Sequence, residues 1–168
     1  PPAGYYEKVQ AILKRYDIFF WADEVITGFG RTGNDFGSTT MGIKPDLMTL
    51  AKQLSSAYMP ISASVISPDM YEAMIEPSSK VGAFGHGYTY SGHPVACAVA
   101  LKTLEIYQRD NVFQRAADVG EYLQSSLRAF ENHPLVGEVR GSGLLAAIEL
   151  VANKGTGKAF DNGSVGGF

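Results

Sequence analysis

The sequence predicts an α/β fold, in which strands alternate with helices around a mostly parallel central sheet. Three short apolar runs, at residues 18–22, 47–51 and 62–66, have the length and composition of buried strands. Segments with the 3.6-residue period of amphipathic helices precede and follow them, at residues 5–16 and 94–109. A continuous apolar strand between helices is typical of a parallel sheet that is covered on both faces, and this pattern defines the fold class.

The composition indicates a globular domain and argues against two classes of partner. Of the 168 residues, 45% are hydrophobic and 18% are charged, and the net charge is −3. A weakly acidic chain without a basic cluster argues against nucleic acid or an anionic membrane as the main partner. The apolar runs are far shorter than the roughly 20 residues of a membrane-spanning helix. The single cysteine, Cys97, cannot form an internal disulfide, so we expect a reduced thiol and a cytoplasmic location.

Two loops and a helix start separate the predicted strands from the helix at 94–109. Residues 27–42 are rich in glycine, and residues 77–92 combine glycine, serine and aromatic side chains without a helical period. We expect both to be loops, and long ordered loops are usually functional. Between them, Ser67 followed by Pro68 is typical of a helix N-cap and first helical position.

The C-terminal part predicts a smaller α+β unit. A second helix is expected over residues 112–131, followed by strands at 135–140 and 144–151. The composition changes near Arg109, and the chain begins at a proline without an initiator methionine, so we expect a segment of a longer chain. We expect three parts, namely residues 1–108, residues 109–151 and a loop or poorly matching tail at residues 152–168.

An acid and an amine stand at the ends of the first two predicted strands. Asp23 follows the run at 18–22, and Lys52 follows the run at 47–51. Ligands of open α/β sheets bind outside the carboxyl ends of the strands, and neighbouring strands lie roughly 4.8 Å apart. A pyridine ring could therefore meet a carboxylate at its nitrogen and an amine at its opposite side. Pyridoxal phosphate needs these two groups, a lysine for the Schiff base and an aspartate beside the ring nitrogen.

Other interpretations of these residues are structural or involve a different cofactor. Taken separately, Asp23 is more often an acid that caps a loop, and Lys52 is more often a solvated charge. Residues 28–33 match the G-x-G-x-x-G pattern of dinucleotide-binding proteins. That motif requires a tight strand–turn–helix, whereas residues 34–40 are poor helix formers, so the dinucleotide interpretation is disfavoured.

The histidines do not predict a metal site. His86, His93 and His133 lack the spacing of metal ligands, so we expect no metal. Residues 86–94 place hydroxyls and glycines directly before a helix N-terminus, a common setting for anion binding. The alternative, an aromatic loop that is simply packed as structure, remains open at this point.

Four segments carry a resemblance to one known family. Residues 21–33 read WADEVITGFGRTG, residues 46–54 DLMTLAKQL, residues 87–94 GYTYSGHP and residues 141–144 GSGL. The first resembles the signature of class III aminotransferases, which are pyridoxal-phosphate enzymes of fold type I, and the second resembles their cofactor-lysine segment. The third is similar to the variant found in the branch that acts on omega-amino acids or on amines with pyruvate. The fourth resembles the start of the small C-terminal domain.

The resemblance implies a role for five side chains. By it, Lys52 is the Schiff-base lysine, Asp23 is the partner of the ring nitrogen and Val25 packs on the ring face. Tyr88 and Thr89 belong to a motif that contacts the cofactor, and the Thr89 hydroxyl reaches the phosphate bound by the neighbouring subunit of a homodimer. Pyridoxal 5'-phosphate is then the cofactor, and an amine donor and an oxo-acid acceptor are the substrates.

The resemblance covers residues 1 to about 151 and has gaps. By it, residues 1–108 are the C-terminal half of the large cofactor-binding domain, and residues 109–151 begin the small domain. Gln53 departs from the family, in which glycine usually follows the lysine. The family's other phosphate contacts and its ring-stacking aromatic correspond to sequence upstream of this chain. The arginine that binds the substrate carboxylate in many members corresponds to sequence downstream.

Three functional hypotheses follow. The first is an aminotransferase that moves an amino group from an amine or omega-amino acid to an oxo acid such as pyruvate. An aminomutase on the same scaffold would use the same Asp23 and Lys52. The third is a noncatalytic fragment that keeps only the dimer surface.

Overall fold

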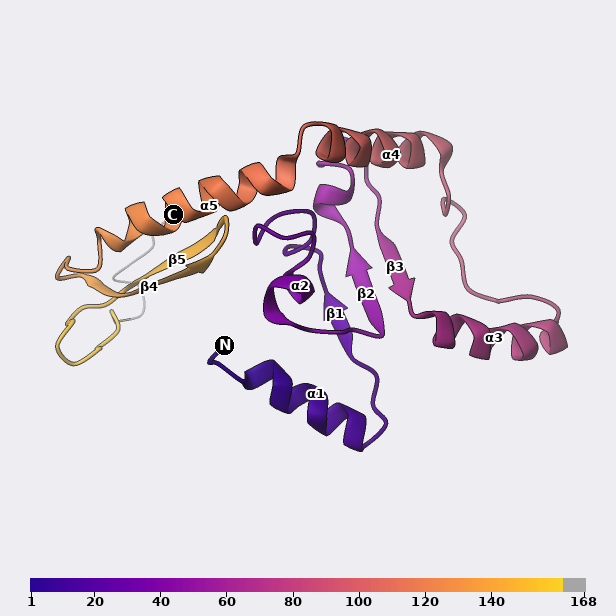
Figure 1. Ribbon diagram of the computed structural model, residues 1–168, viewed down its shortest axis with the longest axis horizontal. Helices are drawn as coiled ribbons and strands as arrows, with labels where there is room; N and C mark the ends of the chain where they lie inside the picture. Colours follow the sequence, from indigo (N-terminus) through magenta and orange to yellow (C-terminus); the bar gives the residue numbers. More distant parts are fainter. Residues whose placement is uncertain (162–168) are drawn as a thin grey trace.

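The computed structural model describes residues 1–161, in which helices and strands alternate along the chain (Figure 1). The helices are α1 (Tyr5–Arg15), α2 (Gly37–Met41), η1 (Lys52–Leu54, a 3₁₀ turn), α3 (Pro68–Val81), α4 (Pro94–Arg109) and α5 (Val112–Arg128). The strands are β1 (Trp21–Asp23), β2 (Leu47–Leu50), β3 (Ala63–Ile66), β4 (Val136–Ser142) and β5 (Leu145–Leu150). The sheet of β1 to β3 lies in the middle, with α5 and the β4–β5 hairpin at one end and α3 at the other.

The central sheet has the strand order β1-β2-β3. β1 and β2 are parallel, with Asp23 opposite Thr49, whereas β3 runs antiparallel to β2, with Ala63 opposite Leu50. The antiparallel direction of β3 was not anticipated from the sequence. A strand's direction depends on the path of the chain between strands, which the composition of the strand itself does not encode.

β1 is shorter and more exposed than the sequence predicts for residues 18–22. Only Trp21–Asp23 form the strand, and Ile18, Phe19 and Trp21 are 54%, 64% and 62% exposed. Ala22 points to the opposite face, as alternate strand residues do, and is buried. The prediction that this strand is buried on both faces is therefore wrong, because the face that carries Trp21 is exposed.

Both predicted loops contain helical segments. α2 lies inside residues 27–42, where the sequence predicts only loop. α3 continues through Pro77 to Val81, so residues 77–81 are helical as well. The proline removes one backbone hydrogen bond but does not end the helix, which stops at Gly82 with a left-handed φ of 89°.

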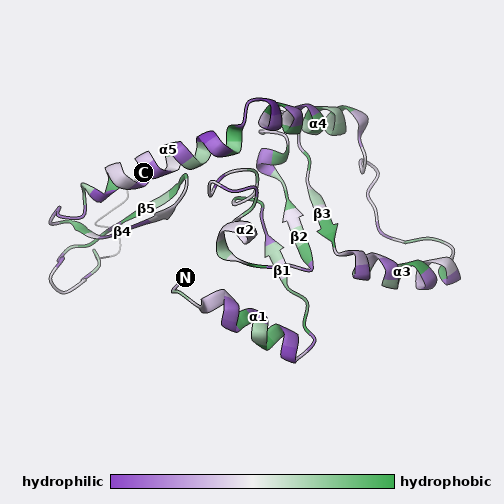
Figure 2. Ribbon diagram, viewed as in Figure 1, coloured by the Kyte–Doolittle hydropathy of each residue, from purple (hydrophilic) through white to green (hydrophobic). Residues whose placement is uncertain are grey.

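The predicted start of α3 and the predicted helix at 94–109 are confirmed. Ser67 Oγ accepts a hydrogen bond from the backbone N–H of Met70 (3.3 Å), and Pro68 is the first helical residue. α4 buries Ala96, Ala100 and Thr103, which share one face of the helix because they are spaced by about one turn. Hydrophobic and hydrophilic residues also alternate along α1 and α5, as Figure 2 shows.

The C-terminal unit consists of α5 and an antiparallel hairpin. α5 ends at Arg128 instead of 131, and it packs against β4. β4 and β5 pair from Val136 opposite Leu150 to Ser142 opposite Leu145, so residues 141 and 142, expected as a connection, are part of a strand. Within the expected tail, residues 153 and 158 form an isolated bridge, and residues 162–168 lie outside the described residues.

The core of the described residues is thin. The buried apolar residues are mostly small and are spread over both units, namely Ala22, Leu50, Leu54, Ala96, Ala100, Ala116, Val136 and Val151. The 3₁₀ turn η1 is the exception, because Leu54 and Ser55 are buried beneath α4 next to the carboxyl end of β2. This turn holds the candidate lysine, Lys52, which is exposed just before the buried Leu54 and Ser55.

Candidate active site

Asp23 and Lys52 stand at the same edge of the sheet. β1 and β2 are neighbours and run in the same direction, toward α4 in Figure 1. Asp23 is the last residue of β1, and Lys52 begins η1 just beyond the end of β2. This is the arrangement that the sequence predicts, an acid and an amine at the carboxyl ends of adjacent parallel strands.

The carboxylate of Asp23 is held by one oxygen and exposed at the other. Oδ1 accepts hydrogen bonds from the backbone N–H of Val25 (3.0 Å) and from Thr49 Oγ1 on β2 (3.2 Å). Oδ2 makes no hydrogen bond to any residue that the structure describes. The fixed oxygen orients the side chain and leaves the other free to accept from a ligand.

Lys52 sits in a backbone conformation that is uncommon for a residue with a side chain. Its φ is +45°, and Ser56 and Ala57 in the same turn have φ values of +49° and +62°. Left-handed conformations cost roughly 1–2 kcal/mol for such residues and persist where surrounding contacts fix them. The Lys52 carbonyl accepts from Ser55 N–H (3.2 Å), whereas its amine has no hydrogen bond or ion pair within residues 1–161.

The turn after Lys52 is tied to two distant residues, which sequence reasoning missed. The Tyr107 hydroxyl on α4 donates to the Gln53 carbonyl (2.7 Å) and shares a hydrogen bond with Ser56 Oγ (2.6 Å). The Gln53 side-chain oxygen, in the amide orientation that satisfies both groups, accepts from Arg31 Nη2 (2.7 Å) and Nε (3.2 Å). No local pattern signals these contacts, because their partners are far apart in the sequence.

Glu24, next to Asp23, is a buried carboxylate with a structural role. It is 2% exposed, and its Oε1 accepts from Ser38 N–H (2.6 Å) and from the Ser38 hydroxyl. Its Oε2 accepts from the Thr27 hydroxyl (2.5 Å) and from Gly37 N–H (2.9 Å). Burial raises the pKa of Glu24, but the hydrogen bonds from Ser38, Thr27 and Gly37 outweigh that effect and leave the pKa below its usual value. The charged side chain thereby holds the start of α2 against β1.

The other three predicted residues are placed differently. Val25 is half-buried in the turn that follows Asp23. Tyr88 and Thr89 lie in the exposed loop between α3 and α4, where Tyr88 N–H donates to Ser91 Oγ (3.0 Å). Figure 1 shows this loop beyond α3, apart from the carboxyl ends of β1 and β2. The described chain therefore brings Val25 near Asp23 but brings neither Tyr88 nor Thr89 to it.

The glycines of the G-x-G-x-x-G segment serve packing. A Cβ on Gly30 would lie 2.6 Å from the Phe113 ring, and one on Gly33 would lie 3.2 Å from the backbone of Ala117, both on α5. No helix begins at the third glycine, because α2 starts only at Gly37. The dinucleotide interpretation lacks the tight strand–turn–helix that it requires.

The residues at the sheet edge fit pyridoxal phosphate by their chemistry. A carboxylate oxygen and a primary amine, each free of partners within the described residues, project from strand ends that neighbour each other. This pair supplies the acceptor for a pyridinium N–H and the nucleophile for the cofactor's aldehyde carbon. Asp23 and Lys52 are thus the residues that could hold the cofactor.

The described residues hold neither a group of metal ligands nor a helix that could span a membrane. Within residues 1–161, no three or more histidine, cysteine, aspartate or glutamate side chains gather as metal ligands would. In the same range, no helix combines the length and the apolar character needed to span a bilayer.

The chain matches a family model, Aminotransferase class-III, over residues 1–165. It therefore belongs to the class III aminotransferases, whose cofactor is pyridoxal phosphate. Gamma aminobutyrate transaminase 3, chloroplastic, of Solanum lycopersicum is 52% identical over 95% of this chain and 31% of its own length. Vanillin aminotransferase of Capsicum frutescens is 51% identical over 95% of this chain and 35% of its own length. The chain thus spans about a third of the length of these curated relatives.

Solved transaminase structures share the fold. A structure described as a transaminase with L-ala has a TM-score of 0.94 and 54% identity, covering 96% of this chain and 38% of that one. The omega transaminase from Pseudomonas jessenii in complex with PMP has a TM-score of 0.93 and 51% identity, covering 95% and 35%. These similarities confirm the expected α/β fold of the fold-type I pyridoxal-phosphate transferases.

Proposed function

We propose that the protein is an aminotransferase that moves an amino group from an amine or omega-amino acid to an oxo acid such as pyruvate. The observation that carries this proposal is the pairing of β1 with β2, which puts Asp23 and Lys52 at one sheet edge. Family membership supports the reaction type. The names of the relatives, gamma aminobutyrate transaminase and vanillin aminotransferase, support an omega-amino acid or an amine as donor.

Each of the two side chains has a distinct task in this proposal. When bound, pyridoxal phosphate supplies an electron sink for the substrate carbon. Oδ2 of Asp23 would accept the N–H of the ring nitrogen and favour its protonated form, while Oδ1 stays fixed by Val25 and Thr49. The Lys52 amine would hold the cofactor and, once free again, could carry a proton to and from the substrate carbon. Val25 would lie against the ring.

Further parts of the proposal concern substrate, assembly and domains. The similar structure with L-ala supports pyruvate as acceptor, since alanine is the aminated form of pyruvate.

We propose a homodimer in which the exposed Thr89, within a loop that also holds Tyr88, reaches the cofactor phosphate of the neighbouring subunit. The packing of α5 on β4 supports a small domain that begins near residue 109. The cytoplasmic location is also a proposal, and subcellular fractionation tests it.

Covalent trapping tests the function directly. The protein is mixed with pyridoxal phosphate and reduced with borohydride, and the modified lysine is identified by peptide mass. We expect the cofactor on Lys52, no fixation in Lys52→Ala, and loss of transamination by about a hundredfold or more in that variant. Lys80→Ala, which removes an exposed amine on α3, is the control and should behave as the unmodified protein. Fixation on another lysine, or none, contradicts the proposal.

Product analysis separates the alternatives. An aminomutase returns the amino group to the same carbon skeleton and consumes no oxo acid, whereas an aminotransferase converts pyruvate to alanine in proportion to donor used. A protein that captures the cofactor but forms neither product supports the noncatalytic alternative.

A further inference from the structure

The turn that holds Lys52 has a backbone conformation that its own residues do not favour, and contacts from other segments hold it in place. Lys52, Ser56 and Ala57 all have positive φ, although none of them is glycine. The direction of the Lys52 side chain depends on these angles, because φ and ψ fix where Cβ points relative to the strand. If the turn relaxed to a right-handed or extended conformation, the Lys52 side chain would leave the strand end in a different direction.

Two anchors oppose such relaxation, and they attach to different groups of Gln53. The Tyr107 hydroxyl donates to the Gln53 carbonyl (2.7 Å), and since its single proton is used there, Ser56 Oγ donates to Tyr107 (2.6 Å). Arg31 Nη2 and Nε grip the Gln53 side-chain oxygen at 2.7 and 3.2 Å. Hydrogen bonds that involve a charged donor are roughly twice as strong as neutral ones.

Arg31 is itself fixed from the opposite side. Its carbonyl accepts from the N–H of Leu144 (2.9 Å), which lies in the connection between β4 and β5. A Cβ on Gly143 would lie 2.5 Å from the backbone of Thr32, so the hairpin and the loop that carries Arg31 are in close contact. A continuous series of contacts thus joins the hairpin, Arg31, Gln53 and the Lys52 turn.

We propose that Arg31 and Tyr107 are positioning residues, which hold the Lys52 amine toward the cofactor by clamping the side chain and the carbonyl of Gln53. This rests on the proposed function, since it assumes that Lys52 takes the cofactor. It also gives a role to Gln53 at a position where a glycine, which the family usually has there, would offer Arg31 no side chain to grip.

The test measures how fast the cofactor-free protein captures pyridoxal phosphate on Lys52, by borohydride quenching at successive times and peptide mass. Arg31→Met and Gln53→Ala should each slow capture by about tenfold, as expected for loss of a charge-assisted hydrogen bond. Because both remove the same contact, the double variant should be no slower than either single variant. Tyr107→Phe removes the second anchor, so its effect should multiply with that of Arg31→Met.

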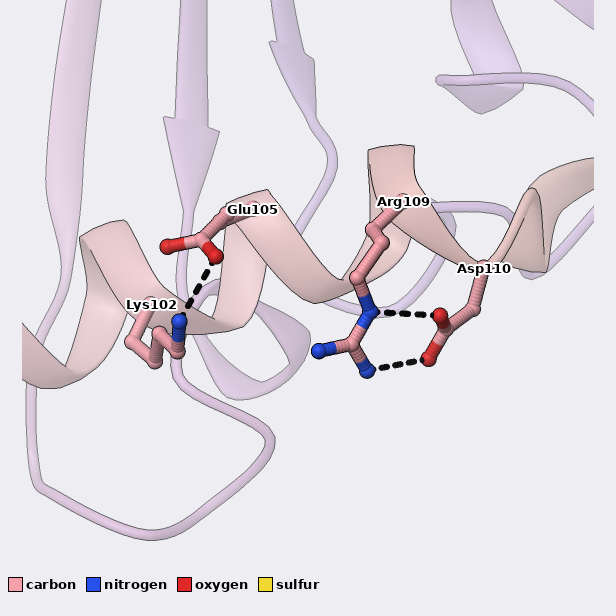
Figure 3. A network of polar contacts seen from close by, with 4 residues as sticks. All are labelled: Lys102, Glu105, Arg109 and Asp110. Atoms are coloured by element: carbon pink, nitrogen blue, oxygen red, sulfur yellow. Dashed lines mark hydrogen bonds and ion pairs between the residues drawn. The ribbon is translucent and has the colours of Figure 1, made fainter.

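Matched controls and a conservative variant separate positioning from general stability. Arg109→Met removes an exposed arginine at the end of α4, whose Nε and Nη2 both bond Asp110 at 2.7 Å (Figure 3). Tyr122→Phe removes the hydroxyl of an exposed tyrosine. Both should capture at the rate of the unmodified protein. Gln53→Glu keeps an acceptor for Arg31 and should retain that rate.

The outcomes distinguish this inference from the proposed function. If the unmodified protein captures no cofactor on Lys52, the proposed function is wrong. The positioning inference is wrong if the unmodified protein captures the cofactor on Lys52 but Gln53→Ala and Arg31→Met capture it as fast as the unmodified protein. It is also wrong if the effects of these two substitutions multiply in the double variant. If circular dichroism shows that Arg31→Met does not fold, the comparison of Gln53→Ala with Gln53→Glu tests the inference by itself. Slow capture in Gln53→Ala with normal capture in Gln53→Glu supports the positioning role, and equal rates in the two variants contradict it.

Discussion

At the scale of single residues, the neighbours Asp23 and Glu24 have opposite environments. Glu24 is buried and uses both oxygens on the hydrogen-bond donors of Thr27, Gly37 and Ser38. Asp23 is exposed and uses only Oδ1. A carboxylate whose two oxygens both accept hydrogen bonds from the protein stabilises the fold. A carboxylate with one oxygen free can accept a hydrogen bond from a ligand.

The pH dependence of stability tests the role of Glu24. Its folded-state pKa is lowered, so its contribution is fully present above the unfolded value of about 4.3 and is lost as the pH falls through the folded value. Glu24→Gln places an NH₂ group against these donors and should lower the free energy of unfolding by about 2–3 kcal/mol near neutral pH. The difference from the unmodified protein should shrink at about pH 3, in denaturant titrations at both pH values.

Glu105→Gln is the comparison for this experiment. The pKa of Glu105 is also lowered, by its hydrogen bond and ion pair with Lys102, but the pair is exposed on α4 (Figure 3). Solvent screens such pairs, so the change in stability should be much smaller. Equal effects of the two substitutions would contradict the structural role of Glu24.

At the scale of elements, the loop at residues 28–34 is the joint between the sheet and the C-terminal unit. Gly30 faces Phe113, and Gly33 faces Ala117, both on α5. Leu144 N–H donates to the carbonyl of Arg31 in the same loop (2.9 Å). Both glycines have positive φ and leave no room for a Cβ, Gly30 against a ring and Gly33 against the α5 backbone, so this packing favours glycine at both positions.

Substitution of Gly30 by alanine tests the joint. Gly30 has a φ of 90°, and the new Cβ would lie 2.6 Å from the Phe113 ring. We expect the free energy of unfolding to fall by about 2–4 kcal/mol, from backbone strain together with overpacking. Gly82→Ala is the control, because Gly82 has a φ of 89° with nothing within 4 Å of the added Cβ. It should cost about 1 kcal/mol. A loss as large at Gly82 would show that strain alone explains both.

At the scale of the whole molecule, the loop with Thr89 lies away from Asp23 and Lys52 of the same chain (Figure 1). Such exposure suits a residue that acts on a neighbouring subunit. Large apolar side chains elsewhere are exposed as well, among them Phe19, Trp21 and Tyr58. The chain spans about a third of the length of these relatives.

A mixed dimer tests whether Thr89 acts across an interface. Lys52→Ala and Thr89→Ala are each expected to reduce transamination when every subunit carries the same change. In a dimer that pairs one of each, one site combines an intact Lys52 with an intact Thr89 from the partner. Activity per dimer should return to about half that of the unmodified protein. If Thr89 acts within its own chain, the activity of the mixed dimer should not exceed the average of the two single-variant dimers.

The site and the fold differ in how far local sequence predicts them. The strand ends at Asp23 and Lys52, the cap at Ser67 and the helix at 94–109 follow from apolar runs and capping residues, which are local signals. α2 was missed because its N-terminus is held by Glu24, which is distant in sequence. Residues 77–81 were missed because Pro77 does not end an exposed helix.

The sequence by itself determined which residues could bind a cofactor and which elements carry them. Strand ends and residue types can be recognised within short stretches of sequence. Only the tertiary structure decided that β3 runs antiparallel and that Arg31 and Tyr107 meet Gln53. These are contacts between segments that lie close in space and far apart along the chain. Their geometry depends on how all the elements pack together, and no local window contains that information.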